Sequence, residues 1–153
     1  MKNLKVKVVL TVLAALFCVC SIAQNAEKTW RWTVEAESCS GDLFDFGVGA
    51  TYGYQFNQRL YAGFGTDVIL NEHADLRLPV FAVAKLDILK EQNTPVVDFR
   101  GGVSMYDEEF PYGFASLAFG YKMKGEKTVV CPMIGWSKTD DSNSMVLRFS
   151  IEF

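Results

Sequence analysis

The chain of 153 residues has room for a single domain, and half of its residues are apolar. It carries 15 basic and 18 acidic residues, a net charge of −3, and the basic residues form no cluster. These features argue against a nucleic-acid-binding protein, and we expect no nucleic-acid partner.

The first 23 residues have the composition of an export signal. Three lysines lie within the first seven residues, an apolar run follows over 8–23, and Ser21 and Ala23 place small residues before a cleavage site. The alternative is a membrane anchor, but the run of 16 residues is shorter than the ~20 that a spanning helix needs. A lipoprotein signal is disfavoured, because bulky residues precede Cys18 and Cys20. We therefore predict a signal peptide over 1–23 and a mature domain over 24–153.

Cleavage would change both the charge and the cysteine content. It removes three of the 15 basic residues, which leaves 12 basic and 18 acidic residues and a net charge of −6. Only Cys39 and Cys131 remain in the mature chain. An exported protein can form a disulfide between them, and two buried thiols are the alternative, because spacing alone does not establish a bridge.

The mature chain resolves into eight segments in which side chains alternate in character, separated by polar or glycine-containing breaks. In chain order these segments are 30–38, 43–56, 60–70, 76–89, 95–106, 112–122, 127–137 and 144–153. The second is the clearest, since every even position from Phe44 to Phe56 is apolar and the odd positions from Asp45 to Gln55 are polar or glycine. No segment after residue 25 has a sustained helical period. We expect an all-β domain, either a sandwich or a barrel.

One face of the segments is apolar throughout and the other carries charges and glycines. Glycine has a low preference for strands, but it gives room to long side chains in a narrow lumen, where opposite charges can pair. We therefore predict that the apolar face meets lipid and that a charge network fills the interior. The predicted network is Arg31, Glu35, Glu37, Asp45, Asp67, Arg77, Lys85, Asp87, Asp98, Arg100, Arg148 and Glu152.

Segment length and aromatic content support a membrane location. Tilted strands of ~9–11 residues cross a bilayer, aromatic side chains gather near the segment ends as in interfacial girdles, and closure removes the unpaired edges that lipid does not tolerate. We predict an all-β fold, an eight-stranded antiparallel up-and-down transmembrane β-barrel preceded by a cleavable signal peptide. The alternative is a soluble periplasmic lipocalin-like barrel that binds a ligand in an apolar lumen.

The sixth segment does not fit a single alternation. Tyr112 and Phe114 have one parity, whereas Leu117 and Phe119 have the other. We expect a β-bulge near 114–116 to reconcile them.

The mature chain resembles the small outer-membrane β-barrels of Gram-negative bacteria, the OmpA/OmpX-like superfamily. The resemblance covers the mature chain and is carried by 48–68, 77–88 and 146–153. It implies an outer-membrane location with both termini periplasmic, lipid as the surrounding partner, and a last strand that the barrel-assembly machinery reads. The residues of that signal would be Leu147, Phe149, Ile151 and Phe153. We expect the chain to depart from the family in two ways, by lacking a peptidoglycan-binding domain and by having shorter outer loops than the adhesive members.

The sequence offers little chemistry for catalysis. The single histidine, His73, lies in a polar break beside Glu72 and Asp75, whereas a zinc site needs three or four ligands. Glu35 and Glu37 could form an acid–base pair, but the arginines of the same face favour a charge network. We predict no enzyme, no cofactor and no metal site. An outer-membrane enzyme with its catalytic groups at the outer rim is the less favoured alternative.

The predicted lumen is narrow enough to be filled. An eight-stranded barrel has an interior that side chains can fill, and Tyr61, Phe81 and the basic residues point into it. The predicted function is a small closed outer-membrane barrel with a structural or surface-interaction role, without catalysis or an open pore. We expect a monomer, and the sequence does not identify its surface partner.

Overall fold

The computed structural model describes residues 30–41, 44–56, 59–71, 73, 75–89, 93–106, 111–125, 128–139 and 142–153. The predicted signal peptide and its cleavage site lie outside these residues. Within the described ranges, no helix is long and apolar enough to cross a membrane.

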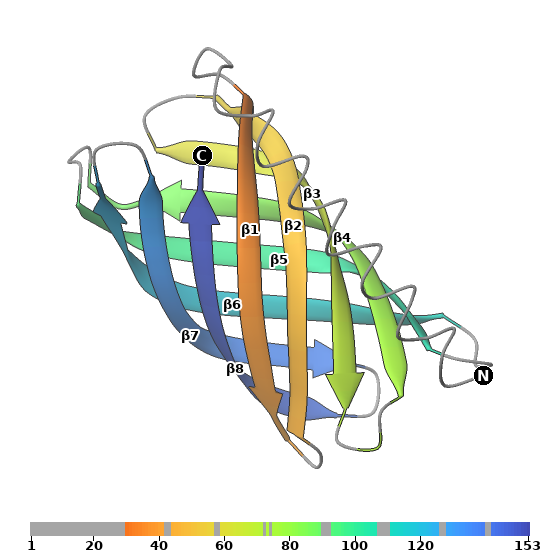
Figure 1. Cartoon of the computed structure of the whole chain (residues 1–153). Coiled ribbons are helices and arrows are strands. Elements are labelled where there is room, and N and C mark those ends of the chain that lie inside the picture. The colour runs from red at the N-terminus through yellow and green to blue at the C-terminus, as the bar shows by residue number, and fades with distance from the viewer. Residues whose placement is uncertain are drawn as a thin grey trace.

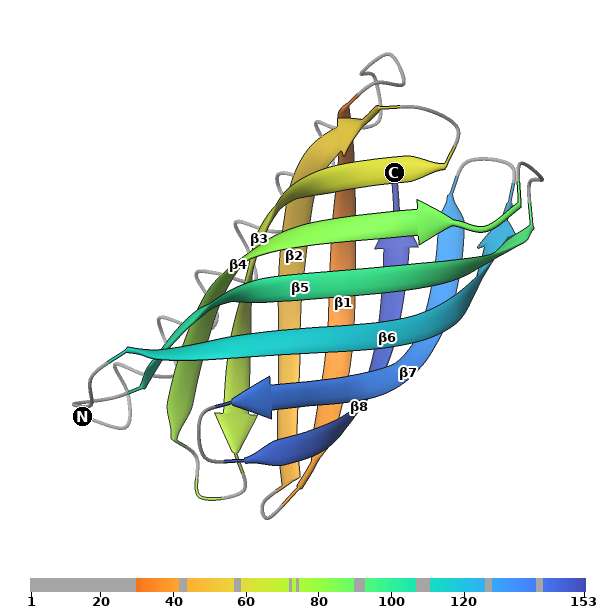
Figure 2. The same cartoon turned by 180° about the vertical axis from the view of Figure 1, so that it is seen from behind.

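Eight strands make up the described fold (Figure 1). They are β1 (Trp30–Ser40), β2 (Phe44–Gln55), β3 (Leu60–Asn71), β4 (Leu76–Asp87), β5 (Thr94–Tyr106), β6 (Tyr112–Lys124), β7 (Val129–Thr139) and β8 (Asn143–Glu152). Each strand pairs antiparallel with the next, and β8 pairs with β1, so the sheet closes into a barrel (Figure 2). The predicted eight-stranded up-and-down barrel is confirmed, and strand ends differ from the predicted ends by at most two residues.

The two ends of the barrel are different. The described chain begins and finishes at one end, where the backbone N–H of Phe153 donates to the carbonyl oxygen of Trp32 at 2.9 Å. We call this the terminal end, and it also carries the connections 56–59, 88–93 and 125–128. The opposite end, the loop end, carries the connections 41–43, 72–75, 107–111 and 140–142.

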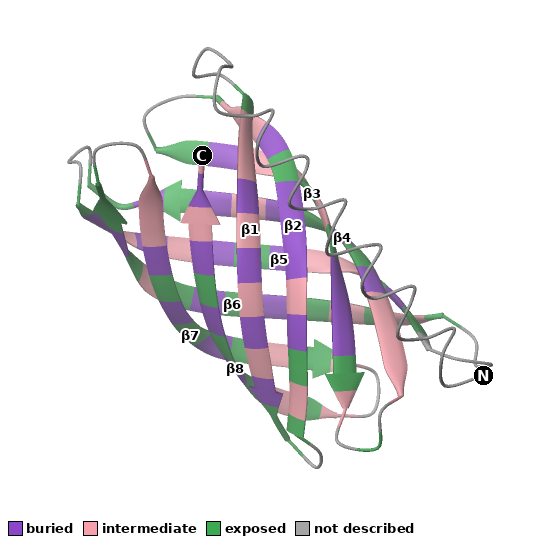
Figure 3. Cartoon of the chain, in the orientation of Figure 1, coloured by how far each residue is buried: buried purple, intermediate pink, exposed green. Residues whose placement is uncertain are grey.

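The barrel is apolar outside and polar inside. Buried and exposed positions alternate along the strands, as the bands of Figure 3 show. On the outer face Phe64 is 75% exposed and Trp136 is 64% exposed, whereas the lumen-facing Arg100 and Asp98 are 1% and 0% exposed. Among the described strand residues with outward parity, only Ala50 and Val68 are buried. A lipocalin-like calyx has the opposite arrangement, with its apolar face inside.

The expected bulge in β6 is wrong. β6 pairs with β5 in one unbroken register from Lys122 opposite Thr94 to Tyr112 opposite Ser104. Tyr112 and Phe114 therefore share the inward face of the strand. Phe114 packs edge-on against the lumen-facing Phe81, with ring centroids 6.1 Å apart. The parity conflict arises because two aromatic side chains fill the loop half of the lumen.

An aromatic cluster covers the outer face of β1 and β2 at the terminal end. Trp30 stacks on Tyr52 with ring centroids 5.0 Å apart, and Tyr54 meets Trp30 and Phe56 edge-on at 5.2 and 5.1 Å. Rings of this kind have an apolar body and, in Trp and Tyr, a polar tip, which suits the interface between lipid and water.

Candidate functional site

All twelve residues of the predicted charge network have inward parity in the barrel. The strands bring them together because residues two apart on one strand share a face, and the pairing register of neighbouring strands fixes their position along the barrel axis. Together with Lys122, which also faces the lumen, these residues form three tiers along the barrel axis. The terminal tier is Arg31, Lys85, Asp87, Lys122 and Glu152, the central tier is Glu35, Glu37, Asp67, Asp98, Arg100 and Arg148, and the loop tier is Asp45 and Arg77.

Two arginines hold the central tier together. Arg100 pairs with Glu35 and donates from Nε to Asp98 Oδ1 at 2.9 Å. Arg148 donates to the same Asp98 oxygen at 2.9 Å and to Glu37 Oε2 at 3.0 Å. Both arginines are buried, so these pairs carry the charge-assisted hydrogen bonds that make a buried charge tolerable.

The two outer tiers are smaller. In the terminal tier Lys122 Nζ lies 3.0 Å from Asp87 Oδ2 and 3.3 Å from Glu152 Oε2, and Lys85 Nζ lies 3.7 Å from the other oxygen of Glu152. In the loop tier Arg77 Nη2 donates to Asp45 Oδ2 at 2.6 Å and Nη1 donates to the Tyr112 hydroxyl at 3.4 Å. These contacts connect strands that are not neighbours in the sheet.

Sequence reasoning missed Lys122. Its parity matches Ser116 and Ala118, which are buried, and not the exposed Leu117 and Phe119. The signal was present in the sequence, but the expected bulge left the parity of this strand undecided. With Lys122 included, the described lumen network has seven acidic and six basic side chains.

Aromatic side chains fill the space between the tiers. The Arg100 guanidinium lies over the Phe81 ring, 4.8 Å from its centroid, and Lys85 Nζ lies 5.6 Å from the centroid of Tyr61. The Tyr61 hydroxyl donates to Thr51 Oγ1 at 3.4 Å. The prediction that Tyr61 and Phe81 point into the lumen is confirmed.

The two cysteines are buried, and the histidine is exposed. Cys39 and Cys131 are buried free thiols, which is the second of the two alternatives. His73 is exposed on a turn closed by Asn71, whose side-chain oxygen accepts from the backbone N–H groups of His73 and Asp75 at 3.0 and 2.8 Å. Among the residues that the structure describes, no three His, Cys, Asp or Glu side chains are placed to hold a metal ion.

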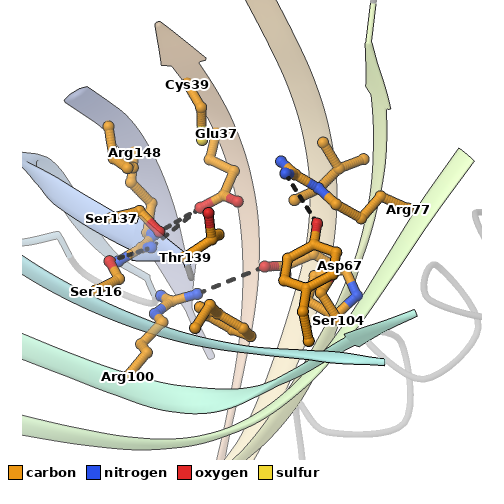
Figure 4. Close-up of a pocket in the computed structure, with 15 residues that line it drawn as sticks. Glu37, Cys39, Asp67, Arg77, Arg100, Ser104, Ser116, Ser137, Thr139 and Arg148 are labelled. Atoms are coloured by element: carbon orange, nitrogen blue, oxygen red, sulfur yellow. Dashed lines mark hydrogen bonds and ion pairs between the residues drawn. The ribbon is translucent and has the colours of Figure 1, made fainter. Parts of the chain in front are cut away.

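The loop half of the lumen contains a small cavity (Figure 4). Its lining includes Glu37, Asp67, Arg100 and Arg148 of the central tier. Tyr112, which contacts Arg77 of the loop tier, also lines it. About 30 Å³ is open to the centres of water molecules, which is room for about two waters.

Gly65 and Gly101 provide a matched test of the two faces. A Cβ on the inward-facing Gly65 would lie 2.7 Å from two ring atoms of Phe81, whereas a Cβ on the outward-facing Gly101 would meet nothing closer than the Phe114 carbonyl oxygen at 4.0 Å. We expect Gly65→Ala to lower the free energy of unfolding by about 1–3 kcal/mol through overpacking. Gly101→Ala should change the free energy of unfolding by no more than about 0.5 kcal/mol. Urea unfolding of the lipid-reconstituted barrel measures both, and equal losses would contradict the assigned faces.

Comparison with solved structures identifies the fold. Neisserial surface protein A superposes with a TM-score of 0.64 at 10% identity, over 80% of this chain and 94% of that chain. This chain has the fold of small eight-stranded membrane barrels. A de novo designed transmembrane β-barrel superposes with a TM-score of 0.60 at 13% identity, over 83% of this chain and 98% of the other, and the outer membrane enzyme PagL with 0.58 at 10%, over 79% and 98%. No family model matches the chain, and no curated protein matches it in sequence.

Proposed function

We propose that the protein is a small, closed barrel of the Gram-negative outer membrane, with both termini periplasmic and a structural or surface-interaction role. The observation that carries this proposal is the inside-out arrangement: the exposed face is apolar around the barrel, and every charged side chain of the three tiers points inward. Lipid is the environment in which such a face is stable and closure leaves no unpaired strand edge. The strands of 10–13 residues also suffice to cross a bilayer.

A surface-interaction role would use the loop end. Its four connections have three to five residues each between strand ends. We propose that the last strand is read by the barrel-assembly machinery, and the exposure of Leu147 and Phe149 on the outer face of β8 supports this. We propose that the barrel acts as a monomer, with lipid as its surrounding partner.

Catalysis is not part of the proposal. PagL is an outer membrane enzyme and has this fold, so the fold by itself permits catalytic groups on the barrel. In this chain the one histidine lies in a loop-end turn, and a Ser–His–Asp arrangement could be built only there. No observation favours that arrangement over the structural role.

Extraction tests the membrane location. We expect the mature protein to stay with the membrane fraction through salt and alkaline washes and to enter solution only with detergent, because its apolar exterior has no aqueous partner. Fractionation of a Gram-negative host with immunoblotting gives the measurement, and a soluble periplasmic protein serves as the control. Recovery of the barrel in the soluble periplasmic fraction would contradict the proposal.

Conductance tests the closed lumen. We expect the purified barrel to give no stable single-channel current in a planar bilayer, because Arg100, Arg148 and Phe81 occupy the lumen and the cavity above them holds about two waters. A porin of 16 strands recorded in the same bilayer is the positive control. Stable, reproducible channels from the wild-type barrel would show that the lumen is open.

A further inference from the structure

The outward face of the described strands carries a single charge. Lys138 is the only charged residue with outward parity on these strands, and its side chain is exposed. It lies one residue before the end of β7, at the loop end of the barrel. None of the described carboxylates forms an ion pair with it. A lysine is tolerated on a lipid-facing surface only near the interface with water, so the Lys138 ammonium lies at the level of the lipid headgroups.

A row of small residues runs from Lys138 across the neighbouring strands. Lys138 is opposite Ala115 on β6, and Ala115 is opposite Gly101 on β5. Gly101 is in turn opposite Ala82 on β4, and Phe64 on β3 ends the row. Because the strands of a barrel tilt, the row descends from the loop end of β7 to the middle of β4, over a distance of about 14 Å. We call Ala115, Gly101 and Ala82 the small-residue row.

The small-residue row is lower than the surface beside it. Its side chains extend no further than Cβ, and a Cβ on Gly101 would meet nothing closer than 4.0 Å. On its terminal side the next row consists of Trp136, Leu117 and Phe99, which pair in this order across β7, β6 and β5 and are all exposed. On its loop side a Cβ on Gly113 would have nothing within 4 Å. Large apolar side chains therefore border an apolar strip that begins at a positive charge.

A lipid with a negative headgroup has the chemistry that matches this surface. Its phosphate would supply the negative charge that no described neighbour offers to Lys138, and its acyl chain is apolar and narrow, like the row. A second copy of the barrel fits less well. Every carboxylate of the described strands has inward parity, so the outer face of another copy would give Lys138 no acidic partner.

We propose that Lys138 and the small-residue row bind one phosphate-bearing lipid of the outer leaflet. The phosphate lies on the Lys138 ammonium, and one acyl chain follows the row toward Phe64. This inference rests on the outer-membrane location proposed above and adds to it a lipid of defined headgroup chemistry at a defined place on the barrel.

The test compares two brominated lipids around the full mature barrel in phosphatidylcholine vesicles. Bromine quenches a nearby indole, and in a chain carrying Trp30→Phe and Trp32→Phe the one remaining tryptophan, Trp136, reports on the small-residue row. We expect brominated phosphatidic acid to quench Trp136 as if its local concentration were about fivefold that of brominated phosphatidylcholine at the same mole fraction, because one basic residue near a membrane surface gives a preference of about this size for an anionic lipid.

Matched variants locate the site. Lys138→Gln should bring the two lipids to equal quenching, because the phosphate loses its charged partner. Lys124→Gln is the control: Lys124 is exposed at the end of β6 at the terminal end, so its loss changes the charge of the barrel equally and should leave the preference intact. Ala115→Phe keeps Lys138 but fills the row, and it should also lower the preference. Ala62→Phe, on the outer face of β3 near the terminal end, should not.

The remaining outcomes contradict the proposal. Equal quenching by the two lipids in the inserted barrel overturns it and leaves the outer-membrane proposal standing, whereas a barrel that does not insert into the vesicles overturns both. Equal losses in Lys138→Gln and Lys124→Gln would show a general charge effect. An unchanged preference in Ala115→Phe would mean that the lysine attracts headgroups without a bound acyl chain, and the row would then be no part of a site.

Discussion

Ala82→Arg is expected to prevent stable insertion of the barrel. Ala82 lies in the middle of β4 on the exposed outer face, opposite Phe64 on β3 and Gly101 on β5. A lipid-facing arginine near the bilayer midplane costs about 2–4 kcal/mol, a large part of the 5–15 kcal/mol that separates folded from unfolded states of a typical domain. Folding into lipid vesicles, read from the electrophoretic shift between folded and unfolded barrel, measures the effect.

The control for this variant is Met105→Arg. Met105 lies on the outer face of β5, one residue before the strand ends at the loop end. An arginine near the interface can extend its charge to water, and the expected cost is about 0–1 kcal/mol. Normal insertion of Ala82→Arg would mean that the outer face of β4 does not meet the midplane of a bilayer. Equal failure of both variants would indicate a general intolerance to arginine.

Much of the fold follows from alternation along the sequence. In 44–56 the alternation with a period of two is unbroken. The strand, the face on which each side chain lies and the surroundings of that face can therefore be predicted together. The same logic placed all twelve network residues in the lumen. It failed at β6, because Tyr112 and Phe114 are apolar residues on a polar face, and a pattern read one strand at a time cannot show that Phe114 packs against Phe81 on β4.

The ion pairs within the lumen could not be predicted from the sequence, for a related reason. Which acid meets Arg100 or Arg148 depends on register and on side-chain reach across the barrel, and Arg148 contacts Glu37 on the neighbouring strand as well as Asp98 three strands away. The unpaired Ser104 hydroxyl and the cavity beside it are also properties of packing. Alternation along the sequence shows on which face of the sheet each side chain lies, but not which residues it contacts.

The similar structures show how little of the function the fold determines. A barrel designed de novo, a bacterial surface protein and an outer membrane enzyme share the architecture with this chain at 13% identity or less. What they share is the solution to one physical problem, a closed sheet with every backbone group paired in lipid. The features particular to this chain are its tiers of lumen charges and its loop end, and experiments on its role belong there.

Arg100→Met is expected to destabilise the barrel by about 3–5 kcal/mol, the usual cost of removing one partner from a buried ion pair. Arg100 is 1% exposed and contacts Glu35, Asp98 and Asp67, so the variant leaves three buried carboxylates with fewer positive charges around them. Methionine preserves most of the side-chain volume, and the loss therefore reports on charge. Urea unfolding in lipid vesicles, followed by tryptophan fluorescence, gives the free energy of unfolding.

Arg31→Met removes a charge from the same lumen at its solvent-exposed end. Arg31 is 31% exposed and lies 3.5 Å from Glu152, and a pair of this kind contributes about 0–1 kcal/mol. Adding Glu35→Gln to Arg100→Met should recover part of the lost stability, because the second change removes one of the orphaned charges. If Arg100→Met and Arg31→Met lose the same small amount, the central tier is solvated and does not hold the barrel together. A large loss at Arg100 that Glu35→Gln relieves would instead locate the stability of the barrel in its buried charges.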